Sequence, residues 1–170
     1  MRWRLLGGAA LLVLILDQAA KWKIASFLAP WDVFPLTDFF NLVHVRNRGA
    51  AFGFLNSPDI SWQFWLFGAA AFLALGIICL VADKADEKEK PLFCGLGAIA
   101  GGALGNLLDR IRFRAVIDFL DLHYDGWHWP AFNLADVAIC AGAFITALFL
   151  LRSRRPPLPR PYARSQGSGR

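Results

Sequence analysis

Residues 91–110 read PLFCGLGAIAGGALGNLLDR, an apolar run that ends in polar and charged side chains. About 20 apolar residues suffice to cross a bilayer as a helix, so this run predicts a membrane span over about 91–108. Glycines recur there at every fourth position, a spacing that lies on one face of a helix: Gly97, Gly101 and Gly105. A ridge of such small residues lets a neighbouring backbone approach closely. The stretch therefore predicts a helix inside a tightly packed membrane bundle.

Three further apolar runs accompany this one, so we expect four spans, over about 5–25, 60–82, 91–108 and 130–151. Of the 170 residues 56% are hydrophobic and only 18% are charged, whereas a soluble domain carries about 25% charged residues. Tryptophans flank the second and fourth runs, which is typical of the headgroup level of a membrane. The composition excludes a soluble, a disordered or a disulfide-rich protein. We therefore predict an all-α membrane protein built as a four-helix bundle.

The Lys and Arg residues predict how these spans are oriented. With four spans both termini lie on the same side, and 11 of the 18 basic residues fall in the termini or in the loop after the second span. Because cytoplasmic segments carry an excess of Lys and Arg, we expect both termini in the cytoplasm. The segment 152–170 is basic and contains four prolines, so we interpret it as a disordered cytoplasmic tail. Residues 1–151 then form one membrane domain.

Two segments between the spans face outward, 26–59 and 109–129. The first contains an alternating stretch over 40–46, FNLVHVR, which predicts a strand. Neither segment is large enough to build a core of its own, so both must lie on the membrane surface.

Polar and ionisable side chains stand at the outer ends of the predicted spans. An ionisable group inside a membrane costs about 2.5–3.5 kcal/mol on the insertion scale, so it marks a functional candidate. Asn106 and Arg110 share a face of the third helix, and Asn133 and Asp136 share a face of the fourth. The other members of the group are Asp17, Gln18 and Asp109. Polar residues in bundles also join helices through hydrogen bonds, and we expect that role for most of this set.

Two carboxylates are more informative than the rest. Asp136 lies below the membrane surface in the fourth span, and Asp118 interrupts the apolar stretch 116–120. If these two groups meet, they cannot both ionise readily, so one pKa is raised and the pair shares a proton. Such a pair activates water with its ionised member and protonates a scissile carbonyl with the other, as in aspartic proteases. This chemistry needs no metal ion and no cofactor.

Other functions remain open at this point. Asp17, Asp109 and Asp136 would serve as a relay in a small proton-coupled transporter or channel, and polar residues that only lock helices together would make the protein a scaffold. A zinc peptidase is disfavoured because the three histidines lack the spacing of a zinc motif. Lys21 and Lys23 lie near the outer end of the first span, so we interpret both as anchors whose charged ends reach the interface.

Five motifs resemble those of lipoprotein signal peptidase, also called signal peptidase II, and they occur in the same order over about residues 5–150. The motifs are 17–21 (DQAAK), 47–53 (NRGAAFG), 101–110 (GGALGNLLDR), 116–119 (VIDF) and 132–136 (FNLAD). The resemblance implies an aspartic endopeptidase of the bacterial cytoplasmic (inner) membrane with its active site near the outer face. Such an enzyme removes the signal peptide from diacylglyceryl-modified prolipoproteins, cutting just before the lipid-modified cysteine.

The resemblance also implies roles for individual residues. Asp118 and Asp136 are expected to be the catalytic pair. The positions expected to bind substrate or support the site are Asp17, Asn47, Asn106, Asp109, Arg110 and Asn133. Segment 26–59 is expected to form a small β-rich cradle with a short surface helix that closes over the substrate. Expected partners are the prolipoprotein, membrane lipid and globomycin-type cyclic peptides. No metal, cofactor or nucleic acid is implied, and the single compact bundle predicts a monomer.

Overall fold

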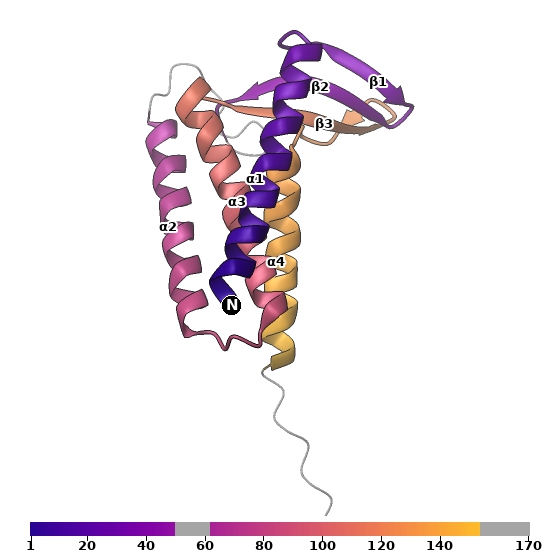
Figure 1. The fold of residues 1–170 in the computed structure, drawn as a ribbon. Coiled ribbons are helices and arrows are strands. Elements are labelled where there is room, and N and C mark those ends of the chain that lie inside the picture. Colours follow the sequence, from indigo (N-terminus) through magenta and orange to yellow (C-terminus); the bar gives the residue numbers. More distant parts are fainter. Residues whose placement is uncertain (50–61, 154–170) are drawn as a thin grey trace, which may run out of the picture.

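The computed structural model describes residues 1–49 and 62–153, which form four long helices with a small sheet across one end of them (Figure 1). The helices are α1 (Arg2–Phe27), α2 (Gln63–Lys84), α3 (Lys90–Phe113) and α4 (Leu134–Ser153). All four are long and apolar enough to cross a membrane, so the predicted four-helix membrane fold is confirmed. The tail after residue 153 and positions 50–61, which include the end of the segment 26–59 expected to carry a surface helix, are outside the described residues.

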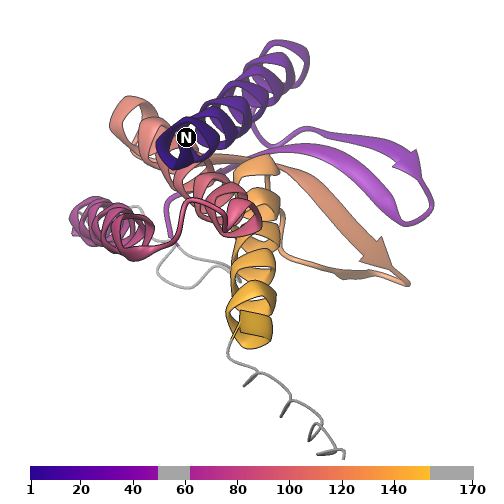
Figure 2. The same ribbon diagram turned by 60° about the horizontal axis from the view of Figure 1, so that its bottom comes forward.

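α3 lies at the centre of the bundle because its glycines let two other helices approach its backbone (Figure 2). On one face, a Cβ atom at Gly97 would come 2.5 Å from the Leu6 carbonyl oxygen of α1. On another face, a Cβ atom at Gly102 would come 2.5 Å from the Ala135 carbonyl oxygen of α4. A side chain at either position would push a helix away. The predicted glycine ridge thus packs against α1, while Gly102 belongs to a second contact face.

α2 packs along α3 and stands apart from α1 and α4 (Figure 2). Most of its side chains are exposed in the isolated chain, which suits a helix that faces lipid. At the end away from the sheet it joins a hydrophobic cluster that includes Ala82 and Phe93. At the sheet end, the Arg114 guanidinium carbon lies 4.0 Å from the centre of the Phe64 ring, a cation–π contact. α2 is therefore fixed at its two ends.

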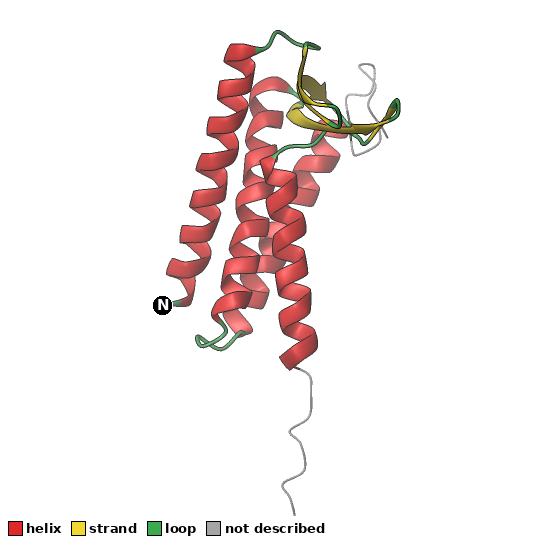
Figure 3. Ribbon diagram, turned by 90° about the vertical axis from the view of Figure 1, so that its right-hand side faces the viewer, coloured by secondary structure: helices red, strands yellow, loops and turns green. Residues whose placement is uncertain are grey.

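An antiparallel sheet crosses one end of the helices, with the strand order β1-β2-β3-β4 (Figure 3). The strands are β1 (Val33–Thr37), β2 (Phe40–Asn47), β3 (Val116–Tyr124) and β4 (Trp127–His128). The pairing of β2 with β3 joins the two predicted outward segments and places Val45 opposite Asp118. The predicted strand over 40–46 is confirmed, and the second outward segment also contributes to the sheet.

α3 extends past the predicted end of its span. The apolar run predicts a span that ends at about residue 108, whereas the helix continues to Phe113 and is followed by Arg114, whose φ of 56° is left-handed. The charged side chains remain in the helix because they have partners inside the protein: Asp109 is buried and forms an ion pair with Lys21. The chain then turns directly into β3, which carries Asp118.

Candidate active site

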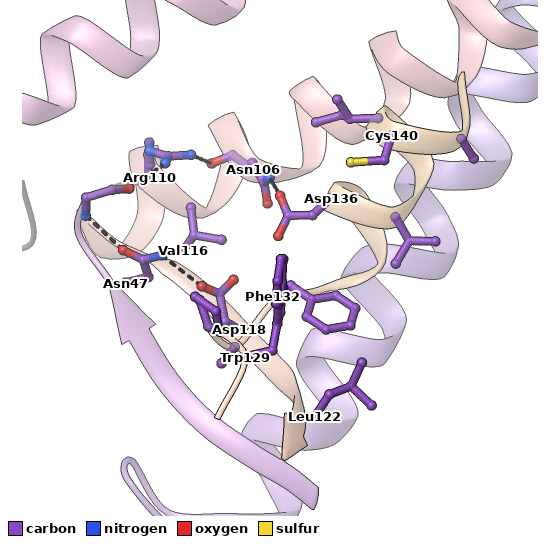
Figure 4. Close-up of a pocket in the computed structure, with 16 residues that line it drawn as sticks. Asn47, Asn106, Arg110, Val116, Asp118, Leu122, Trp129, Phe132, Asp136 and Cys140 are labelled. Carbon is purple, nitrogen blue, oxygen red and sulfur yellow. Dashed lines mark hydrogen bonds between the residues drawn. The ribbon is translucent and has the colours of Figure 1, made fainter. Parts of the chain in front are cut away.

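A cavity of about 760 Å³ lies where the sheet meets the ends of α3 and α4 (Figure 4). Its polar lining brings together five of the residues predicted from the sequence: Asn47, Asn106, Arg110, Asp118 and Asp136. Much of the remaining lining is apolar and includes Trp129 and Phe132. A pocket with a few polar groups in an apolar wall is typical of a binding or catalytic site.

Asp118 projects into this pocket from β3, and its side chain is only 3% exposed. The Nδ2 groups of Asn47 and Asn133 donate hydrogen bonds to its two carboxylate oxygens, at 2.9 and 2.6 Å. Burial raises the pKa of Asp118 to about 7, and repulsion from Asp136 adds to this effect, while the two amide donors oppose it. Asp118 therefore holds a proton readily near neutral pH.

Asp136 reaches the same pocket from the first turn of α4, so that the two carboxyl groups point toward each other (Figure 4). Asn133 precedes this helix and caps it, because its Oδ1 accepts a hydrogen bond from the Asp136 N–H at 3.0 Å. In return, the Asn133 N–H donates to Asp136 Oδ2 at 3.2 Å. Asn106 Nδ2 donates to the other oxygen at 2.8 Å. Both carboxylate oxygens of Asp136, at the start of α4, thus accept hydrogen bonds from amide N–H groups.

Arg110 places a cation in the pocket wall. Its two terminal nitrogens donate to the carbonyl oxygens of Asn106 and Gly49, both at 3.3 Å. Its guanidinium carbon lies 4.5 Å from the centre of the Phe67 ring. Among residues 1–49 and 62–153, the buried Nε has no hydrogen-bond partner. One buried donor of Arg110 is therefore unpaired among the described residues.

Asp17 and Asp109 were also predicted as site residues, but neither lines the pocket. Both lie behind it in a buried ion cluster, each with a carboxylate oxygen 2.9 Å from Lys21 Nζ. The interpretation of Lys21 as an interfacial anchor is therefore wrong, since its side chain is only 2% exposed. The spacing of Asp17 and Lys21, one helical turn apart, is the signal that would have identified the pair.

No candidate metal centre accompanies these carboxylates. Within the described ranges, no group of three or more His, Cys, Asp and Glu side chains could hold a metal ion. His44 is buried, with Nδ1 2.8 Å from the Leu28 carbonyl oxygen, and His128 Nδ1 lies 2.9 Å from Asp121. The polar site residues that line the pocket are the two aspartates, two asparagines and one arginine named above, and Asn133 is hydrogen bonded to both aspartates from outside the lining.

A four-helix membrane bundle with two facing aspartates in a pocket at one end defines a class of protein, the membrane-embedded aspartic peptidases. Comparison with known proteins identifies the family within this class. The model of the family described as signal peptidase (SPase) II matches residues 9–152. The chain belongs to this family, the lipoprotein signal peptidases, and is an aspartic endopeptidase that processes prolipoproteins.

Relatives and solved structures agree with this membership. The lipoprotein signal peptidase of Oleidesulfovibrio alaskensis is 55% identical over 149 residues, covering 85% of this chain and 93% of the relative. That of Nitratidesulfovibrio vulgaris is 48% identical over 157 residues, covering 92% and 94%. Among solved structures, a bacterial membrane enzyme determined by the in meso method at 2.3 Å has a TM-score of 0.78 and 27% identity, and the match covers 90% of this chain and 91% of that one.

Proposed function

We propose that Asp118 and Asp136 are the catalytic pair of this signal peptidase. The observation that carries the proposal is their convergence from β3 and α4 on one pocket, where each carboxyl group accepts hydrogen bonds from asparagine amides. Asp118, with a pKa of about 7, provides the protonated member. Asp136, at the start of α4 and close to the amide donors, provides the ionised member.

The two carboxyl groups then divide the chemistry of hydrolysis. Ionised Asp136 takes a proton from a water molecule, and the water oxygen attacks the scissile carbonyl carbon. Protonated Asp118 gives its proton to the carbonyl oxygen, which yields a neutral gem-diol. When the diol collapses, the C–N bond breaks and the leaving nitrogen takes the proton from Asp136, while a diol hydroxyl returns its proton to Asp118. Both groups end in their starting states.

Arg110 is the residue best placed to hold the substrate backbone. Its side chain lines the pocket, and a charge-assisted hydrogen bond from the guanidinium group would fix a substrate carbonyl group. Asn47, Asn106 and Asn133 would support the carboxylates, and Asp17 and Asp109 would hold the backbone behind them. The substrate is a diacylglyceryl-prolipoprotein, cut just before its lipid-modified cysteine. A pocket at the end of the helices suits a substrate whose acyl chains stay in lipid while water reaches the peptide bond.

The enzyme would work in the bacterial cytoplasmic membrane, with both termini in the cytoplasm and the pocket near the outer face. Two observations support this orientation: the excess of Lys and Arg on the side of the termini, and the position of the sheet at the opposite end from the N-terminus (Figure 1). Residues 1–151 would be the peptidase domain and 152–170 a cytoplasmic tail. One chain supplies every residue of the proposed site, so a monomer embedded in lipid would suffice.

Cleavage of a purified lipidated precursor tests this proposal. We expect a product whose mass corresponds to scission just before the lipid-modified cysteine, and we expect a globomycin-type cyclic peptide to block its formation by occupying the same pocket. The control is the same precursor without its diacylglyceryl group, which should remain uncut. Scission at another bond, or equal cleavage of the unlipidated precursor, would contradict the proposed specificity.

The pH dependence of the reaction should follow the proton on Asp118. A carboxyl group with a raised pKa is protonated below that value, so the required acid is present at neutral and lower pH and is lost as the pH rises through about 7. We therefore expect kcat/KM to fall about tenfold per pH unit on the alkaline side. As a control, Asp125→Asn in an exposed turn should leave the alkaline limb of the pH profile unchanged. A profile that stays flat well above pH 7 would exclude Asp118 as the acid.

A further inference from the structure

Lys21 is buried although its side chain carries a charge. An ammonium group has three N–H donors, and here each has an acceptor at 2.9 Å: Asp17 Oδ2, Asp109 Oδ2 and Asn106 Oδ1. Two carboxylates compensate the burial of the cation, which would suffice for an ordinary structural ion pair between α1 and α3. The third donor, however, goes to a neutral amide that lines the pocket.

The two carboxylates bound to Lys21 also hold the backbone of the site. Asp17 Oδ1 accepts a hydrogen bond from the Ala135 N–H at 3.0 Å. Asp109 Oδ2 accepts one from the Ile117 N–H at 3.2 Å. Ala135 and Ile117 each directly precede one of the proposed catalytic aspartates. The ammonium group therefore supports both parts of the site, because the carboxylates that it fixes anchor β3 and the start of α4.

The contact with Asn106 determines which way its amide points. An ammonium group can only donate, so the Asn106 oxygen must face Lys21 and its Nδ2 must face Asp136, to which it donates at 2.8 Å. Asn133 Nδ2 donates to the same Asn106 oxygen at 3.2 Å. With the amide reversed, its oxygen would face the carboxylate of Asp136, and its nitrogen would face two donors, Lys21 Nζ and Asn133 Nδ2. Lys21 thus selects the orientation in which the Asn106 amide donates to Asp136.

We infer that Lys21 is a positioning residue for peptide hydrolysis: its ammonium fixes the Asn106 amide toward Asp136 and, through Asp17 and Asp109, fixes the backbone before both catalytic aspartates. The inference rests on the proposed roles of Asp118 and Asp136. A purely structural ion pair would not need the third N–H donor of Lys21. A positioning role requires that donor for the chemical step. Loss of that donor should lower kcat and leave KM almost unchanged, because Lys21 does not line the pocket.

The first test compares Lys21→Met with Lys23→Met in cleavage of the lipidated precursor. Methionine has a similar length but neither charge nor donors. Lys23 lies in the same helix and is exposed, so its replacement removes the same charge without touching the cluster. We expect kcat to fall about 100-fold in Lys21→Met, the scale of a misplaced catalytic group, and to stay within about twofold of wild type in Lys23→Met.

The pH profile separates positioning from general destabilisation. Asp118 faces Asp136 and Arg110 in the pocket, and the positive charge of Lys21 behind them lowers its pKa. Removing that charge should shift the alkaline limb of kcat/KM to higher pH in the Lys21→Met variant. A variant that only loses stability would keep the limb of the wild-type enzyme. The Lys23→Met profile serves as the reference.

A second variant covers the case in which Lys21→Met does not fold. Lys21→Met combined with Asp17→Asn removes one negative charge as well, so the cluster keeps its original net charge. We expect this double variant to fold and to show a kcat well below that of Asp17→Asn alone. Equal kcat values, or wild-type kcat in Lys21→Met, would overturn the positioning role, as would failure of both Lys21 variants to fold. None of these results tests the proposed catalytic role of Asp118 and Asp136. That role would be contradicted only if the aspartate variants themselves stayed active.

Discussion

Replacement of Asp136 by asparagine is expected to abolish prolipoprotein cleavage, with a fall in kcat of about 10⁴-fold or more. Asparagine keeps the shape of the side chain and an oxygen that can accept the hydrogen bond from Asn133 N–H or Asn106 Nδ2. It cannot take a proton from water. Asp118→Asn should have a similar effect, because the amide cannot give a proton to the scissile carbonyl group. Single-turnover cleavage of the lipidated precursor measures both losses.

The control for this experiment lies on the same strand as Asp118. Asp121 is also buried, but it is hydrogen bonded to Asn41 at 2.8 Å and does not line the pocket. We expect Asp121→Asn to keep kcat within a few-fold of wild type. Size-exclusion profiles and thermal unfolding in detergent show whether each variant is folded. Full cleavage by folded Asp118→Asn or Asp136→Asn would rule out the proposed pair.

The second large effect is expected at Asn133. Its side chain is fully buried and has three roles: it donates to Asp118, donates to Asn106 and caps α4. Asn133→Ala should lower kcat by about 10²–10³-fold, the range observed when one preorganised donor is removed from an active site. Loss of the cap should also lower the stability of the protein by about 1 kcal/mol.

Asn133→Asp separates these two effects. Aspartate is as good a helix cap as asparagine, so the cap on α4 is retained. Its carboxylate cannot donate to Asp118 and brings a further negative charge next to the pair. We therefore expect a kcat at least as low as that of Asn133→Ala although the cap is present, measured on the fraction of the variant that remains folded in detergent. If Asn133→Asp retained the wild-type kcat, the donors of Asn133 would have no part in catalysis.

The sequence predicted the spans and the polar pocket residues at their outer ends because these depend on local patterns. Hydropathy and length identify the four helices, and the acids at the ends of the spans are conspicuous against an apolar background. The strand β2 shows regular alternation and was predicted, whereas β1 contains Pro35, is exposed along its whole length and has no such pattern.

Contacts between distant residues account for the features that were not predicted. In the sequence, Lys21 lies near the end of a predicted span, a position typical of an interfacial anchor. Its burial depends on Asp109, which another helix brings beside it. The same ion pair allows α3 to continue beyond its apolar run. No local pattern contains this information, because the charges are compensated only when α1 and α3 pack together.

The hydrogen bonds to the Ile117 and Ala135 N–H groups also restrict where the length of this chain can change. Each ties a proposed catalytic aspartate in register to a helix, so a residue inserted between Asp109 and Asp118 would carry that carboxyl group out of the pocket. The turn at Asp125 and Gly126 is different: both have positive φ angles, and the space around Gly126 is open. A spectroscopic label or an affinity tag belongs in this turn, where an altered loop length leaves the register of both aspartates intact.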